Sequence, residues 1–90
     1  MSVEIYIPQF LQHLANGVEV VDVNGRTVGE CLNNLVKQFP QLEASLFDKN
    51  GELHTLLNVY INGESAYPEE LTKPVNDGDK LQIMYTLVGG

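Results

Sequence analysis

The sequence predicts an α+β fold in which a mixed β-sheet packs on one main helix. Apolar and polar residues alternate with the two-residue period of strands near both ends of the chain and around residue 59. A single stretch, residues 28–39, has the 3.6-residue period of an amphipathic helix. Four Asn-Gly pairs separate these segments, and both residues of such a pair tolerate the positive φ of tight turns.

The first strand is expected near residues 2–7, where Val3, Ile5 and Ile7 alternate with polar or amphipathic residues. Pro8 ends it because proline cannot donate to the ladder. The connection that follows is too long for a tight hairpin and has room for a helical turn.

Residues 18–23 are rich in valine and predict a second strand, antiparallel to the first. Two phases are open here. Val18 and Val20 compete with Val21 and Val23 for the inward face.

The helix is expected to start at a capping box, in which Thr27 accepts from an amide of the first turn and Glu30 reaches back to the cap. Pro40 ends it. One stripe of this helix is apolar and consists of Val28, Leu32, Leu35, Val36 and Phe39.

Beyond the helix, Leu42 and Leu46 allow one further helical turn. Strands are expected around residues 57–61 and 81–85, and the irregular segment between them leaves room for one more short strand. A single helix covers only one face of such a sheet, which is the β-grasp (ubiquitin-like) arrangement. We expect one domain, residues 1–88, followed by a flexible Gly-Gly tail, residues 89–90.

Composition excludes several classes of function. The chain has 90 residues and a net charge of −7, which disfavours binding to nucleic acid and favours a basic protein partner. It has no apolar run near the roughly 20 residues of a membrane span, so no membrane partner is expected. The acidic start does not look like a secretory signal, and a cytoplasmic location is expected.

The sequence offers no catalytic or metal-binding motif. A phosphate-binding loop is absent, so the chain is expected to bind no ATP or other cofactor itself. His13 and His54 lack the spacing of a zinc site, and Cys31 falls within the helix like a small buried hydrophobe. We therefore expect no metal and no enzyme activity.

The remaining feature is the pair Gly89-Gly90. A carboxylate at Gly90 is ionised at neutral pH and resists nucleophiles until it is activated, for example as an acyl adenylate. Lacking Cβ atoms, the two glycines can enter a channel too narrow for other residues.

The whole chain resembles the small sulfur-carrier proteins of the β-grasp superfamily, in particular the molybdopterin synthase small subunit and the thiamine-pathway carriers. The matching segments are Phe10-Leu11-x-x-Leu14, Thr27-Val28-Gly29-Glu30-x-Leu32, Phe39-Pro40-x-Leu42, Asn58-Val59-Tyr60-Ile61-Asn62-Gly63-Glu64, Pro74-Val75-x-Asp77-Gly78-Asp79 and Gly89-Gly90. The longer segment from Asp48 to Leu57 favours the molybdopterin-like branch.

The resemblance implies a sulfur carrier, not itself an enzyme, that can be the small subunit of a synthase complex. An E1-like adenylyltransferase uses ATP to adenylate Gly90, with Gly89 as its flexible neighbour. A sulfur donor then makes a thiocarboxylate, which a synthase large subunit or another acceptor enzyme consumes. The alternatives are a ubiquitin-like modifier joined to lysines through Gly90, and a plain interaction domain.

A partner surface is expected on the sheet face that the helix leaves open. If Ile5, Val59, Ile61, Leu81 and Ile83 face the helix, then Tyr6, Tyr60 and Met84 lie on the opposite face. Aromatic and methionine side chains in such places can anchor an interface. Leu87 and Val88, just before the glycines, are expected to contact the same partner.

Overall fold

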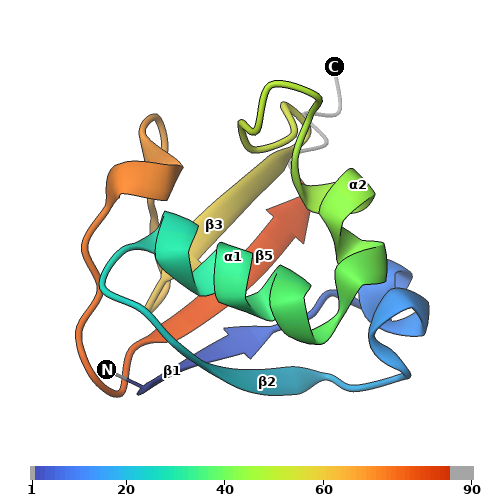
Figure 1. Ribbon diagram of the computed structural model, residues 1–90. Helices are drawn as coiled ribbons and strands as arrows, with labels where there is room; N and C mark the ends of the chain where they lie inside the picture. Colours follow the sequence, from blue (N-terminus) through green and yellow to red (C-terminus); the bar gives the residue numbers. More distant parts are fainter. Residues whose placement is uncertain (1, 86–90) are drawn as a thin grey trace.

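Five strands form one mixed sheet, and helix α1 lies across one of its faces (Figure 1). The computed structural model describes residues 2–85. The strands are β1 (Ser2–Tyr6), β2 (Val20–Asn24), β3 (Leu57–Ile61), β4 (Glu64–Ser65) and β5 (Lys80–Tyr85). Their order is β2-β1-β5-β3-β4, with β1 and β5 parallel and the other neighbours antiparallel. The strand nearest the C-terminus is therefore the central strand of the sheet.

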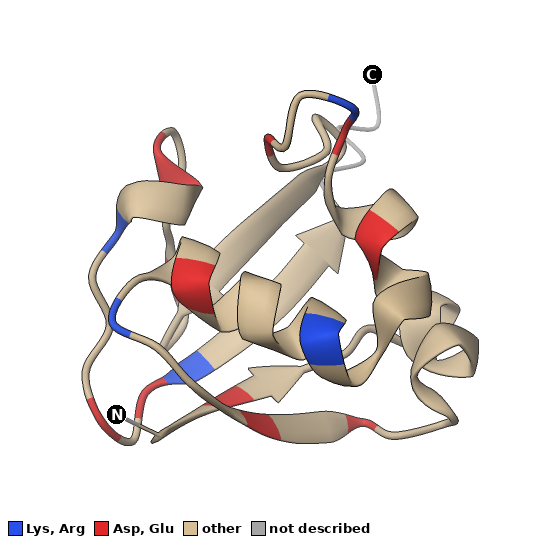
Figure 2. Ribbon diagram, viewed as in Figure 1, with Lys and Arg blue, Asp and Glu red and all other residues tan. Residues whose placement is uncertain are grey.

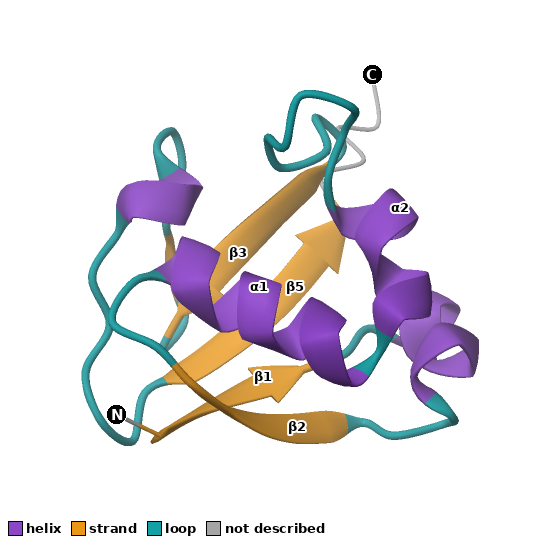
Figure 3. Cartoon of the chain, in the orientation of Figure 1, coloured by secondary structure: helices purple, strands orange, loops and turns teal. Residues whose placement is uncertain are grey.

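Helices occupy the connections between the strands (Figure 3). The main helix is α1 (Val28–Gln38), followed by η2 (Pro40–Leu42) and α2 (Glu43–Leu46). Two further 3₁₀ segments are η1 (Gln9–Ala15) and η3 (Glu70–Thr72). No helix in the described part of the chain combines the length and apolarity that a membrane crossing needs.

The core lies between α1 and the sheet. Leu32 and Leu35 of the predicted apolar stripe are fully buried, whereas Val36 and Phe39 pack at its margin. On the sheet side the predicted inward residues Ile5, Val59, Leu81 and Ile83 are buried, and Ile61 is partly buried.

The structure also resolves the phase of β2. Val21 and Val23 are buried, whereas Val18 and Val20 are 37% and 38% exposed. The reason is pairing with β1, because Val21 lies opposite the buried Ile5. The strand starts at Val20, two residues later than the valine pattern predicts.

The predicted capping box is present with one difference. The Glu30 amide donates to Thr27 Oγ1 at 3.2 Å, but the Glu30 carboxylate accepts from the Arg26 amide, at 2.8 Å. The backbone around the cap is held by residues 73–75, because Val28 N donates to Lys73 O and Val75 N donates to Arg26 O. This contact orients the residue before the cap towards the carboxylate.

Two distant turns are joined by side-chain hydrogen bonds. Asn62 has the left-handed φ of 51° in the turn after β3, and its Nδ2 donates to Asp79 Oδ1 at 2.9 Å. Its Oδ1 accepts from the Lys80 amide at 2.9 Å, and Asp79 Oδ2 accepts from the Asn76 amide at 2.8 Å. We call Asn62, Asn76, Asp79 and Lys80 the turn clamp. It fixes the start of β5 against the end of β3.

Replacing Asp79 tests the turn clamp. Asp79→Ala removes the carboxylate that accepts both hydrogen bonds. The bonds are exposed and water can replace the lost acceptor, so we expect a loss of about 1 kcal/mol in the free energy of unfolding. Urea titration measures it. Glu19→Ala, at an exposed carboxylate, is the control and should change the same quantity by less than about 0.5 kcal/mol. Equal losses would contradict a specific role for the clamp.

Cys31 belongs to the core. It is fully buried in α1, and a Cβ added to Gly25 would lie 2.7 Å from its Sγ, so glycine is needed for the close packing of this turn. Burial, with a smaller contribution from the negative charge of Glu30, raises the pKa of the thiol to about 11. The thiolate is the reactive form, so this thiol is poorly suited to nucleophilic chemistry.

Alkylation measures this protection. The ordinary pKa of a thiol is 9.0, so at pH 9.0 the Cys31 thiol is half ionised in the unfolded chain, whereas in the folded chain it keeps its proton. We expect iodoacetamide to label native Cys31 at least about tenfold more slowly than the chain in denaturant, because each pKa unit changes the thiolate fraction about tenfold. Equal rates would show that the thiol is accessible.

Candidate functional site

The predicted tail follows the central strand of the sheet. Gly89 and Gly90, together with Leu87 and Val88, lie outside the described residues. β5 ends at Tyr85. It pairs with β1 over residues 80–82 and with β3 over residues 81–85. The segment that carries the two glycines therefore follows the central strand, which has a partner strand on each side (Figure 1).

The predicted partner residues lie on one face of the sheet. Tyr6 and Tyr60 both lie opposite Gln82 of β5, one from each side, so the three side chains form a row across the strands. Met84 is two residues further along β5 on the same face and is the diagonal neighbour of Tyr60. Both tyrosines are partly buried, and Met84 is 44% exposed. We call Tyr6, Tyr60 and Met84 the open-face patch.

Charged residues border the open-face patch on one side. Glu4 lies opposite Asp22 on β2 and opposite Lys80 on β5, which gives a second row with two acidic residues and one basic residue. Tyr6 Oη donates to Glu4 Oε1 at 3.4 Å. Figure 2 shows acidic residues along β2 and at the neighbouring end of β1. This border suits a partner that is apolar in the middle and basic at its edge.

An aromatic pair stands at the end of β5 and was not predicted from the sequence. Phe10 of η1 stacks on Tyr85, with ring centroids 4.8 Å apart and planes inclined by 20°. Both rings remain exposed by more than 40%. They line a small cavity of about 160 Å³ together with Leu57 and His54. The only signal in the sequence was an aromatic residue in each of two segments that had no reason to be paired.

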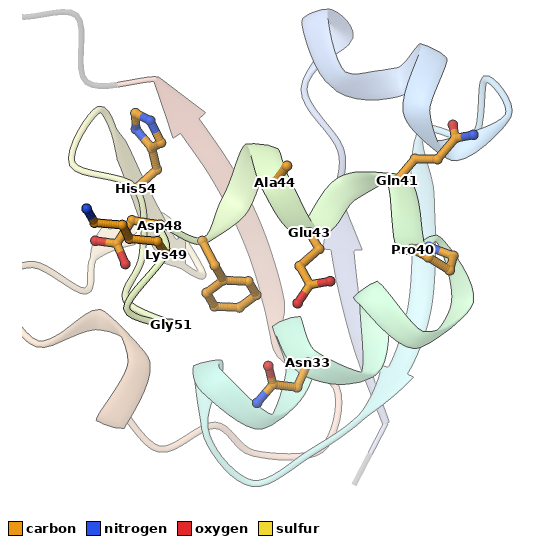
Figure 4. A pocket seen from close by; sticks show the side chains of 10 residues that line it. Asn33, Pro40, Gln41, Glu43, Ala44, Asp48, Lys49, Gly51 and His54 are labelled. Atoms are coloured by element: carbon orange, nitrogen blue, oxygen red, sulfur yellow. The ribbon is translucent and has the colours of Figure 1, made fainter.

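A larger hollow adjoins this cavity, and His54 lines both of them. It has a volume of about 880 Å³ and is open, between the α1–α2 region and the loop that carries residues 47–54. Figure 4 shows Glu43 on one side of it and Asp48 and His54 on the other. Within residues 2–85, no three His, Cys, Asp or Glu side chains come close enough together to hold a metal ion. The described residues of this hollow therefore form no metal site.

Comparison with known proteins agrees with this picture. The model of the ThiS family matches residues 5–90. The sulfur carrier protein CysO of Mycobacterium tuberculosis is 29% identical over 93 residues, spanning 100% of both chains. Small archaeal modifier protein 1 (SAMP1) of Haloferax volcanii is 42% identical over 71 residues, 78% of each chain.

Solved structures of similar proteins have the same fold as this chain. The crystal structure of SAMP1 from Haloferax volcanii has a TM-score of 0.85 and 34% identity, and the match covers 100% of both chains. A chain in the BexX/CysO complex of Amycolatopsis orientalis has a TM-score of 0.86 and 31% identity, covering 98% of this chain and 99% of that one. These neighbours confirm the predicted β-grasp fold.

The relatives also decide the class of protein. Their names describe a small sulfur carrier and a small modifier, and not an enzyme, which agrees with the prediction that this chain is not itself an enzyme. The CysO of Amycolatopsis orientalis has been crystallised in a complex with BexX. With a family model that spans nearly all of its length, this chain belongs to the ThiS family.

Proposed function

We propose that the chain carries sulfur as a thiocarboxylate on Gly90. The observation that carries this proposal is the position of residues 89–90 shortly after the central strand of a ThiS-family fold. Five residues of extended chain span at most about 18 Å, enough to reach a buried site in an activating enzyme. The folded body needs no catalytic group of its own, because the partner supplies the chemistry.

The reaction has two steps. In the first, a carboxylate oxygen of Gly90 attacks the α-phosphorus of ATP on an E1-like enzyme, and pyrophosphate leaves. In the second, sulfide attacks the carbonyl carbon of the acyl adenylate, and AMP leaves with the former carboxylate oxygen, so that Gly90 ends as a thiocarboxylate. An acceptor enzyme then consumes the sulfur. A molybdopterin-type destination, suggested by the long segment from Asp48 to Leu57, remains a prediction.

A second candidate function is that of a ubiquitin-like modifier. It is supported by the similarity to SAMP1, whose name describes a modifier. The adenylate would be the same, but a lysine amine would attack it and form an isopeptide bond. The two functions therefore differ in the nucleophile and not in this chain.

Mass spectrometry distinguishes these products. After incubation with ATP, the activating enzyme and a sulfur donor, we expect the intact chain to gain the mass of one sulfur in place of one oxygen. Deleting Gly89 and Gly90 should abolish the gain and leave the fold unchanged, because the buried core residues of the described chain lie between Val3 and Ile83. Conjugates to lysine in cells, without the thiocarboxylate, would favour the modifier.

The open-face patch is proposed as the surface that binds the activating enzyme. Tyr60→Lys combined with Met84→Lys places two charges in an apolar contact, and we expect the Kd to rise at least about tenfold, or about 1.4 kcal/mol. Isothermal titration calorimetry measures it.

The control adds the same two charges elsewhere. Asn33→Lys combined with Gln41→Lys changes exposed residues beside the hollow of Figure 4, away from the sheet, and should leave the Kd within about twofold. If both double variants weakened binding equally, the effect would come from the change in net charge and not from the patch. Unchanged binding of the first pair would refute the patch as the docking surface.

A further inference from the structure

The outer edge of β2 is the starting observation. β2 is the last strand on its side of the sheet, so half of its backbone groups have no strand partner. Ile7 N donates to Glu19 O at 2.7 Å, so Glu19 directs its backbone groups towards β1. In an antiparallel pair this direction alternates along the strand, so the backbone N–H and C=O groups of Val20, Asp22 and Asn24 point away from β1, to the outer edge. An unpaired edge of this kind is a template on which another chain can add a strand.

Helix α1 occupies two of the outward carbonyls. Asn34 Nδ2 donates to Asn24 O at 2.5 Å, and Gln38 Nε2 donates to Asp22 O at 3.2 Å. The two carboxamides are four residues apart on the helix, about 6 Å along its axis, and the two carbonyls are two residues apart on the strand, about 6.7 Å. Because these two spacings nearly match, side chains on one face of the helix can donate hydrogen bonds to alternate carbonyls of one strand.

The side chains of this edge would otherwise suit pairing. Val18 and Val20 are β-branched and more than a third exposed. An antiparallel pair of two copies centred on Asp22 would be self-complementary, as a two-fold interface requires. It would also bring two Asp22 carboxylates directly opposite each other, which is unfavourable. The repulsion between the two Asp22 carboxylates therefore opposes the same strand pairing that the Asn34 and Gln38 side chains obstruct.

We propose that Asn34 and Gln38 hold shut a latent interface between two copies of this chain along the outer edge of β2. An added strand needs the Asp22 and Asn24 carbonyls as acceptors and would have to displace both side chains. This inference is independent of the carrier function.

The test opens the edge without weakening the helix. The variant Asp22→Thr/Asn34→Ala/Gln38→Ala removes the opposing charge and both donors, and alanine is the best helix former. The matched control Asp22→Thr/Asn33→Ala/Gln41→Ala removes the same residue types. Asn33 and Gln41 are exposed and donate no side-chain hydrogen bond among the described residues, so the edge stays closed. Asp22→Thr/Gln38→Ala is a milder second variant at an exposed helix position.

Sedimentation and amide exchange measure the result. With rising concentration, we expect the sedimentation mass of the Asp22→Thr/Asn34→Ala/Gln38→Ala variant, the opened variant, to rise from 10.0 kDa towards twice that value. The amides of residues 20, 22 and 24 should then exchange at least about tenfold more slowly than in the control. The milder variant should shift less, and the control should stay monomeric. Assembly of variant and control alike would assign the effect to charge and overturn the proposal. So would assembly without slower exchange at these amides, or a monomeric opened variant.

Discussion

The packing of α1 on one face of the sheet is the constraint on which the other features depend. Side chains alternate along a strand, so once Ile5, Val59 and Ile83 are buried under the helix, their neighbours must face the other way. The open-face patch is thus a consequence of the core. Hydrogen bonding to β1 and to β3 places β5 at the centre of the sheet, and residues 86–90 follow this strand in the sequence.

Most of the fold follows from local patterns in the sequence. The alternation of β1, β3 and β5, the apolar stripe of α1 and its Thr27 cap are signals within one element, and the structure contains all of them. The phase of β2 is different, because four valines are equally apolar and only pairing with β1 selects two of them. β4 is too short, at two residues, to leave a periodic signal.

The candidate site divides in the same way. Alternation alone places Tyr6, Tyr60 and Met84 on one face, but not the row through Gln82, which depends on strand order. The stack of Phe10 on Tyr85 joins segments from opposite ends of the chain, and no local pattern announces it. The role proposed for residues 89–90 rests on the chemistry of a terminal glycine and on the family to which the chain belongs, and not on the described fold.

The parallel pairing of β1 with β5 has a mechanical consequence. A partner that grips the end of the chain and pulls would load β5 along its own axis, against ladders to β1 on one side and β3 on the other. Hydrogen bonds of a ladder lie across the strands, so such a force acts on them in shear and stretches many of them together. A pull on the C-terminal end would therefore load many of these hydrogen bonds together instead of breaking them one at a time.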